Sequence, residues 1–146
     1  MNAMHICYVA AGSFFLAGLL SGIWKYGGIL RSAEAEAPEY VNILHRAALL
    51  YSFASLLLAQ FVELSNLSDF TEILSVLAVI TFFIFAQFTY LIHAILGDTD
   101  NQFRKPYTLG SWRMPPFMIH GAMVLLILGE VGGFAVLFWG YLRTIL

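Results

Sequence analysis

Four long apolar stretches, separated by three shorter polar ones, dominate the hydropathy pattern of the chain. Each contains a window of about 20 residues with few or no charges, which is the length an α-helix needs to cross a bilayer. We expect spans at about residues 5–25, 42–63, 70–97 and 115–141. Backbone N–H and C=O groups cannot remain unpaired in lipid, so the polar stretches must be loops. The pattern predicts an all-α integral membrane protein: one domain over residues 1–146, folded as a four-transmembrane-helix bundle.

Glycine and proline mark several expected boundaries. Gly97 is expected to stop the third helix, and the Pro115-Pro116 pair suits the start of the fourth. Gly18 and Gly22 form a GxxxG pair in the first span, which favours close packing against another helix.

The composition agrees with a membrane location. Of the 146 residues, 60% are hydrophobic and only 11% are charged, whereas about a quarter of the residues in soluble domains are charged. The single cysteine, Cys7, excludes an internal disulfide and a site with two cysteine ligands. The net charge of −2 and the scattered basic residues offer no nucleic-acid surface. The first apolar run is long for a signal peptide and is followed by Lys25, so we expect a retained helix.

Lysine and arginine are concentrated on one side of the predicted bundle. Six of the seven fall on the side of the first and third loops, and only Arg143 falls on the other. The positive-inside rule therefore predicts that these loops are cytoplasmic and that both termini are on the non-cytoplasmic side. We expect a multi-pass protein of the inner (plasma) membrane. The six residues are Lys25, Arg31, Arg46, Arg104, Lys105 and Arg113.

Three of the four histidines are expected at a similar depth. Helices rise about 1.5 Å per residue, which places His45, His93 and His120 about 10–14 Å from their span centres, all toward the cytoplasmic side. Three imidazoles from three helices could form a cofactor or metal site inside the bundle. Depth is only one coordinate, so the alternative that each ring binds a carbonyl or lies near headgroups stays open. His5, at the outer end of the first span, is expected to be interfacial.

Other polar residues of the second and third spans are also candidates. Arg46 is a natural partner for a propionate or another anion. Gln87, Tyr90 and His93 recur every third residue, which predicts adjoining positions on one half of the helix. Tyr90 could donate a hydrogen bond to a substrate oxygen. Tyr51 lies too close to the middle of its span to be typical of an interfacial aromatic belt.

Glu130 is the only acidic residue deep in an apolar run. An ionised, unpaired carboxylate is costly there, so Glu130 is protonated, paired across helices or facing a polar cavity. A structural hydrogen bond and a role in proton handling are both open alternatives. The neighbouring glycines would allow another helix to approach closely. They are Gly129, Gly132 and Gly133.

The arrangement resembles small four-span membrane isomerases of the styrene oxide isomerase and hydroxylaminobenzene mutase type. Those proteins similarly have a first span with a "GLLSG"-like segment, found here at residues 18–22. They open the second span with a histidine, as in "LHRAALLYSFASLLL", and end the third with a tyrosine segment and a polar loop, as in "FTYLIHAILGDTDNQF".

The resemblance implies a specific chemistry for a small apolar substrate, an aryl epoxide or hydroxylamine. It makes His45 the axial ligand of a b-type haem held between subunits of a homo-oligomer, a trimer, in which ferric iron acts as a Lewis acid. It makes Tyr90 the residue that steers the substrate. Tyr51 stands where those proteins have an asparagine, six residues after the histidine, so a different substrate or a lost activity is implied there.

Two alternatives stay open from the residues alone. Iron with one protein ligand keeps a position free for substrate, whereas iron with two histidines is closed and suits electron transfer. His93 or His120 could supply the second ligand, which would make the protein a bis-histidine b-type membrane cytochrome. The third reading is a cofactor-free accessory subunit of the membrane, whose histidines only cap and pack.

Overall fold

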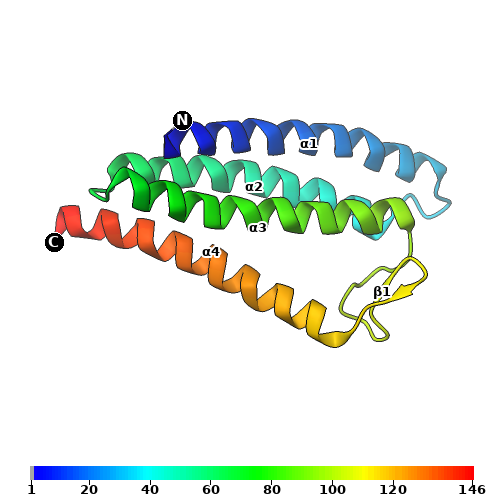
Figure 1. Cartoon of the computed structure of the whole chain (residues 1–146). Coiled ribbons are helices and arrows are strands. Elements are labelled where there is room, and N and C mark those ends of the chain that lie inside the picture. Colours follow the sequence, from blue (N-terminus) through cyan, green and yellow to red (C-terminus); the bar gives the residue numbers. More distant parts are fainter. Residues whose placement is uncertain (1) are drawn as a thin grey trace.

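The computed structural model describes residues 2–146 and contains four long helices (Figure 1). All four are long and apolar enough to cross a membrane, which confirms the predicted four-span fold. A two-stranded antiparallel hairpin, absent from the sequence prediction, lies between the third and fourth helices. The elements are α1 (Ala3–Arg31), α2 (Glu39–Leu64), α3 (Asp69–Leu96), β1 (Thr108–Leu109), β2 (Trp112–Arg113) and α4 (Pro116–Ile145).

Local sequence accounts for the helix ends. The Ser68 side chain caps α3 by accepting a hydrogen bond from the Thr71 N–H. Gly97 ends α3 in the left-handed conformation, with φ of 58°, as predicted. α4 begins at Pro116, also as predicted. The expected loop after the first span was wrong in part, because α1 continues from Lys25 to Arg31. A hydropathy window ends where charge begins, but helical hydrogen bonding continues into the polar region.

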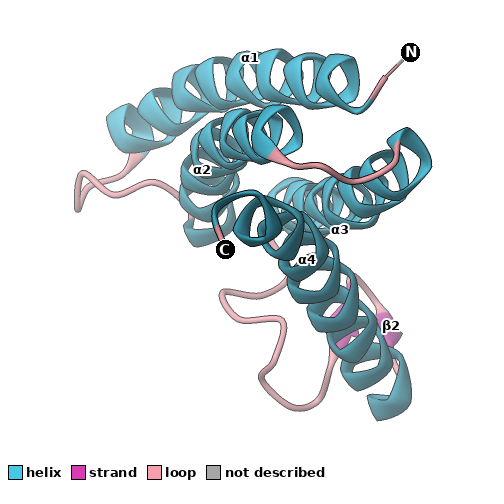
Figure 2. Cartoon of the chain, turned by 90° about the vertical axis from the view of Figure 1, so that its left-hand side faces the viewer, coloured by secondary structure: helices cyan, strands magenta, loops and turns pink. Residues whose placement is uncertain are grey.

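The four helices are unequally packed. α1 packs mainly on α2, and α4 packs mainly on α3. α1 and α4 lie on opposite sides of the bundle, and both termini lie at the same end (Figure 1). α4 leans away from the other helices toward its N-terminal end, where the hairpin loop is (Figures 1 and 2). α4 therefore packs on the bundle along its C-terminal part and diverges from it along its N-terminal part.

Glycine positions show how the closest contacts arise. A Cβ on Gly18 would lie 2.6 Å from a methyl group of Leu49, and a Cβ on Gly22 would lie 3.1 Å from the His45 ring. The GxxxG pair of α1 therefore packs on α2 of the same chain, which confirms the predicted close packing.

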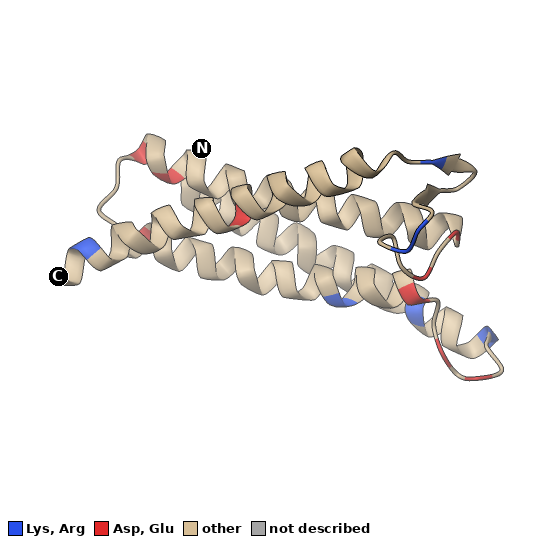
Figure 3. Ribbon diagram, turned by 90° about the horizontal axis from the view of Figure 1, so that it is seen from below, with Lys and Arg blue, Asp and Glu red and all other residues tan. Residues whose placement is uncertain are grey.

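Charged side chains are divided between the two ends of the bundle (Figure 3). Most lysines and arginines lie toward the end with the α1–α2 and α3–α4 loops. The end with the two termini has Glu63, Asp69 and Glu72 together with Arg143. This is the asymmetry from which the sequence predicts the orientation.

Candidate functional site

His45 points from α2 toward α1. Its Nδ1 lies 2.8 Å from the Gly18 carbonyl oxygen. A carbonyl oxygen can only accept a hydrogen bond, so Nδ1 is the protonated nitrogen and donates to it. The ring is half-buried, and within residues 2–146 its Nε2 has no hydrogen-bond partner. A histidine with one nitrogen fixed by a carbonyl in this way can use its other nitrogen to bind a ligand.

The other two histidines of similar depth have separate partners. The His93 Nδ1 lies 2.7 Å from an Asp98 oxygen, and its ring packs on Tyr40 with centroids 4.8 Å apart. The His120 Nε2 lies 3.3 Å from the Tyr107 hydroxyl. Within the described residues, no three His, Cys, Asp or Glu side chains form a group that could hold a metal ion. Three rings at one depth thus occupy three separate environments.

Tyr51, Tyr90 and Glu130 are brought together. They line one cavity of about 190 Å³ between α2, α3 and α4. Glu130 has a buried carboxyl oxygen without a hydrogen-bond partner among the described residues. The cavity is therefore a mostly apolar space lined by a few side chains that carry oxygen atoms, which is the usual composition of a small-molecule site.

Aromatic packing fixes Tyr51 in this cavity. Its ring stacks on Phe83 of α3, with centroids 4.2 Å apart and planes 13° apart. Phe14 of α1 packs on the same ring at 5.7 Å. Contacts of this kind restrict a tyrosine to one orientation, so its hydroxyl is held toward the cavity with little rotational freedom.

The α3–α4 loop covers part of this cavity. Gln102 and Phe103 of the loop line it, and the Gln102 N–H donates a 2.6 Å hydrogen bond to the Tyr40 hydroxyl. Sequence reasoning missed these loop residues. It also missed the hairpin beside them, whose signal was "TLGSWR": a glycine turn, with Gly110 at φ of 59°, between residues that favour strands.

Asp98 anchors the same loop to α3. One carboxylate oxygen accepts from His93, and the other accepts a 2.5 Å hydrogen bond from the Gly110 N–H. Partial burial acts to raise the pKa of Asp98, but the hydrogen bonds from Gly110 and His93 outweigh it, so this pKa lies below its ordinary value. Asp98 is therefore a structural anion that joins the end of α3 to the hairpin.

The remaining predicted residues do not share this site. Arg46 is exposed on α2. Gln87 and His93 line two cavities other than that of Tyr90, although the spacing of the three residues places them on one half of the helix. A step of three residues turns about 60° back around a helix axis, so two such steps spread the side chains over about 120°.

Comparison with known proteins gave no relative. No family model matches the chain, and neither a search of curated proteins nor one of solved structures found a match. The candidate site therefore rests on the geometry of this chain.

Proposed function

We propose that this protein is a haem-containing membrane isomerase that rearranges a small apolar substrate of the aryl epoxide or hydroxylamine class. The observation that carries the proposal is the hydrogen bond from His45 Nδ1 to the Gly18 carbonyl oxygen, which leaves Nε2 as the free nitrogen. A fixed tautomer with an unoccupied nitrogen is what an iron ligand requires.

Two residues near His45 support the proposal of a b-type haem at this position. Gly22 lies against the imidazole, and a Cβ in its place would be only 3.1 Å from the ring. A larger residue there would therefore press on the imidazole ring. The neighbouring Arg46 is exposed and could pair with a haem propionate. When bound, ferric haem would supply a Lewis acid for the substrate oxygen.

The cavity with Tyr51, Tyr90 and Glu130 would receive the substrate. In this proposal, the Tyr90 hydroxyl donates a hydrogen bond to the substrate oxygen and orients it, and Tyr51 contributes a second hydroxyl. The unpartnered Glu130 oxygen provides a proton acceptor or donor at the same cavity. An isomerisation moves atoms within one molecule, so no second substrate or external electron carrier is needed.

The positions of these groups support a homo-oligomer. His45 contacts α1, whereas Tyr51 and Tyr90 line a cavity with α4, on the opposite side of the bundle (Figure 1). A haem on His45 would therefore meet the tyrosine cavity of a neighbouring copy more readily than that of its own chain. A trimer held together by shared haem is the arrangement we propose.

One iron ligand from this chain fits better than two. His93 is buried, holds Asp98 and packs on Tyr40, so it would have to break these contacts to reach a metal. His120 would have to leave Tyr107. The electron-transfer alternative has no observation of this kind in its favour.

The first test of the proposal is haem content. The detergent-purified protein is expected to show a Soret band and about one haem per chain in a pyridine haemochrome assay. His45→Ala should lose this haem, whereas the matched variant His120→Ala should keep it. Normal haem content in His45→Ala would overturn the assignment of the ligand.

The second test is turnover. Styrene oxide and N-phenylhydroxylamine, each supplied without oxidant or reductant, should give a product of unchanged mass, detected by chromatography and mass spectrometry. If haem-loaded wild-type protein leaves both compounds unchanged, the isomerase proposal is contradicted. Only the proposal of haem binding would then stand.

We propose further that both termini lie on the non-cytoplasmic side of the inner (plasma) membrane, because the basic residues gather at the opposite end. Single cysteines in a Cys7→Ser background would test this. In intact cells, a membrane-impermeant maleimide should label Asn66→Cys in the α2–α3 loop and leave Glu34→Cys in the α1–α2 loop unlabelled. The reverse labelling would invert the topology.

A further inference from the structure

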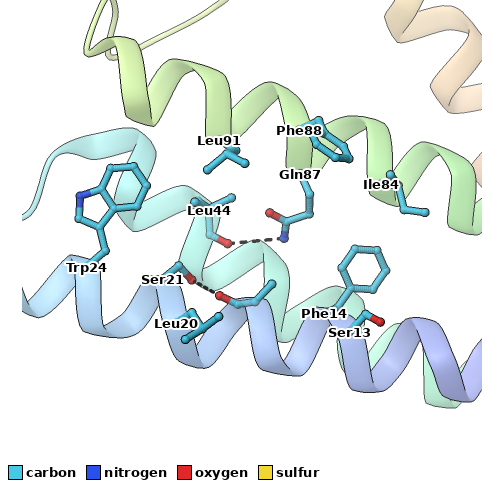
Figure 4. Close-up of a pocket in the computed structure, with 11 residues that line it drawn as sticks. Ser13, Phe14, Leu20, Ser21, Trp24, Leu44, Ile84, Gln87, Phe88 and Leu91 are labelled. Carbon is cyan, nitrogen blue, oxygen red and sulfur yellow. Dashed lines mark hydrogen bonds between the residues drawn. The ribbon is translucent and has the colours of Figure 1, made fainter.

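A second and larger cavity lies apart from the tyrosine cavity. It has a volume of about 490 Å³, opens between α1, α2 and α3, and contains none of the residues assigned to the proposed reaction (Figure 4). Its walls are almost wholly apolar and include the aromatic rings of Phe14, Trp24 and Phe88. The volume falls within the range of cavities that hold small molecules.

Three polar residues line this cavity, Ser13, Ser21 and Gln87, and among them Gln87 has a buried atom without a partner in the described residues. Its side chain extends from α3 into the space between the three helices (Figure 4), and only 8% of its surface is exposed. The amide nitrogen is 3.5 Å from the Leu44 carbonyl oxygen. A carbonyl cannot donate, so the nitrogen must face Leu44, and this orientation fixes the side-chain oxygen as the free acceptor. That oxygen is buried and has no partner among residues 2–146.

An unpartnered acceptor in a membrane interior is unfavourable. A buried polar group without a hydrogen bond destabilises a protein by roughly 1–3 kcal/mol, and lipid acyl chains have no donor to offer. A leucine or methionine at position 87 would fill the same space without this penalty. The glutamine is therefore explained more simply by a molecule that brings a donor to it.

We propose that this cavity binds a bilayer-soluble aromatic molecule carrying one hydroxyl group, such as a phenylalkanol. The hydroxyl donates to the Gln87 side-chain oxygen, and the ring extends past Leu91 toward Trp24, where it makes the edge or offset contacts that aromatic rings favour (Figure 4). The site shares no lining residue with the Tyr90 cavity and does not include His45, although Leu44 precedes His45 in the chain and Phe14 also packs on Tyr51.

The test uses two probes that differ only in the hydroxyl. 2-(4-Nitrophenyl)ethanol and 4-ethylnitrobenzene both quench tryptophan, and only the first can donate a hydrogen bond. Trp24 becomes the sole reporter when Trp112 and Trp139, both exposed and outside the cavity, are changed to phenylalanine. Binding is measured in nanodiscs, with each concentration expressed as its mole fraction in the bilayer to remove differences in partitioning.

The alcohol is expected to bind about fivefold more tightly than the ethyl compound, which is the size of one net hydrogen bond. Gln87→Leu should abolish this preference, and the nearly isosteric Gln87→Met should do the same. Gln60→Leu, on the exposed face of α2, is the matched control and should retain it. In a protein that keeps Gln87 and Trp24, Ala17→Phe should fill part of the cavity and prevent saturable quenching by both probes.

Two results would overturn the proposal. Equal affinities for both probes in the wild type would identify the cavity as an ordinary lipid-filled groove. A preference for the alcohol that persists in both Gln87 variants would place the donor contact elsewhere.

Discussion

The two outer helices of the bundle make very different contacts with the rest of the chain. α1 lies close along α2, with Gly18 and Gly22 accommodating Leu49 and His45. α4 meets α3 closely at Gly129 and Gly133 but leans away toward its N-terminal end, where Gly121 has no neighbour within 4 Å of a Cβ position. The tyrosine cavity lies on this looser side. Most of the α4 residues that line this cavity precede the close contacts at Gly129 and Gly133.

The largest expected effect concerns the tyrosine cavity, on the α4 side of the bundle. Tyr90→Phe removes the hydroxyl that we propose for the substrate oxygen, so kcat should fall roughly 100-fold, the usual loss for one such donor. Tyr26→Phe, on the exposed surface of α1, is the control and should be unchanged. Turnover of the isomerase substrate is the measurement. Equal rates for wild type and Tyr90→Phe would remove Tyr90 from the reaction.

The second effect concerns the place where α4 does pack. A Cβ on Gly133 would lie 2.6 Å from the Ser75 carbonyl oxygen, which belongs to the α3 backbone and cannot easily move. Gly133→Ala should therefore destabilise the protein by about 1–3 kcal/mol. Gly132→Ala has free space and should be neutral or stabilising by up to about 1 kcal/mol. Unfolding of both variants in mixed micelles measures the difference, and equal midpoints would contradict the α3–α4 contact.

The third effect concerns the α3–α4 loop, which covers part of the tyrosine cavity. The pKa of Asp98 is lowered in the folded protein, so its carboxylate stabilises the loop above the ordinary pKa of 3.8. This contribution should decline as the pH falls from 3.8 through the lower folded value. Hydrogen exchange of the Gly110 amide against pH is the measurement.

Asp98→Asn should cost this loop roughly 1–2 kcal/mol at neutral pH and remove the pH dependence below 3.8. Asp100→Asn is the matched control, because Asp100 is exposed and pairs only with Arg104 across one turn of the loop. An unchanged acid profile in Asp98→Asn would show that another group holds the hairpin.

The smallest effect concerns the tightly packed side. The Ser52 hydroxyl donates a 2.9 Å hydrogen bond to the Ala11 carbonyl oxygen across the α1–α2 contact. Ser52→Ala should destabilise the protein by about 0.6 kcal/mol, the average for such bonds in membranes. Ser55, buried on the same helix, bonds only to Tyr51 within α2, so Ser55→Ala should have less effect on detergent unfolding. A larger loss of stability in Ser55→Ala than in Ser52→Ala would mean that the Ser52 hydrogen bond does not stabilise the α1–α2 contact.

Much of the fold could be predicted from the sequence, because a bilayer imposes span length and backbone pairing. The four helices, the stop at Gly97 and the start at Pro116 all follow from that constraint. The extension of α1 to Arg31 could not be predicted, because hydropathy reports the lipid boundary and not the helix end.

Less of the candidate site than of the fold could be predicted from the sequence. Depth along a helix follows from residue number, but rotation about the axis depends on which neighbour each face meets. His45, His93 and His120 share a depth and face three different environments. Tyr51 and Glu130, by contrast, meet in one cavity although 79 positions separate them in the chain. Only tertiary packing supplies this information.

The divergence of α4 also bears on the order of biosynthesis. α1, α2 and α3 leave the ribosome first and already contain every wall of the larger cavity, together with His45 and its Gly18 partner. Glu130 and the loop residues that cover the tyrosine cavity follow later. Because chains form their N-terminal contacts first during synthesis, a nascent chain that has emerged from the ribosome as far as Leu96 would present the larger cavity with the tyrosines still open to lipid. Completion of α4 is therefore the step that encloses the tyrosine cavity.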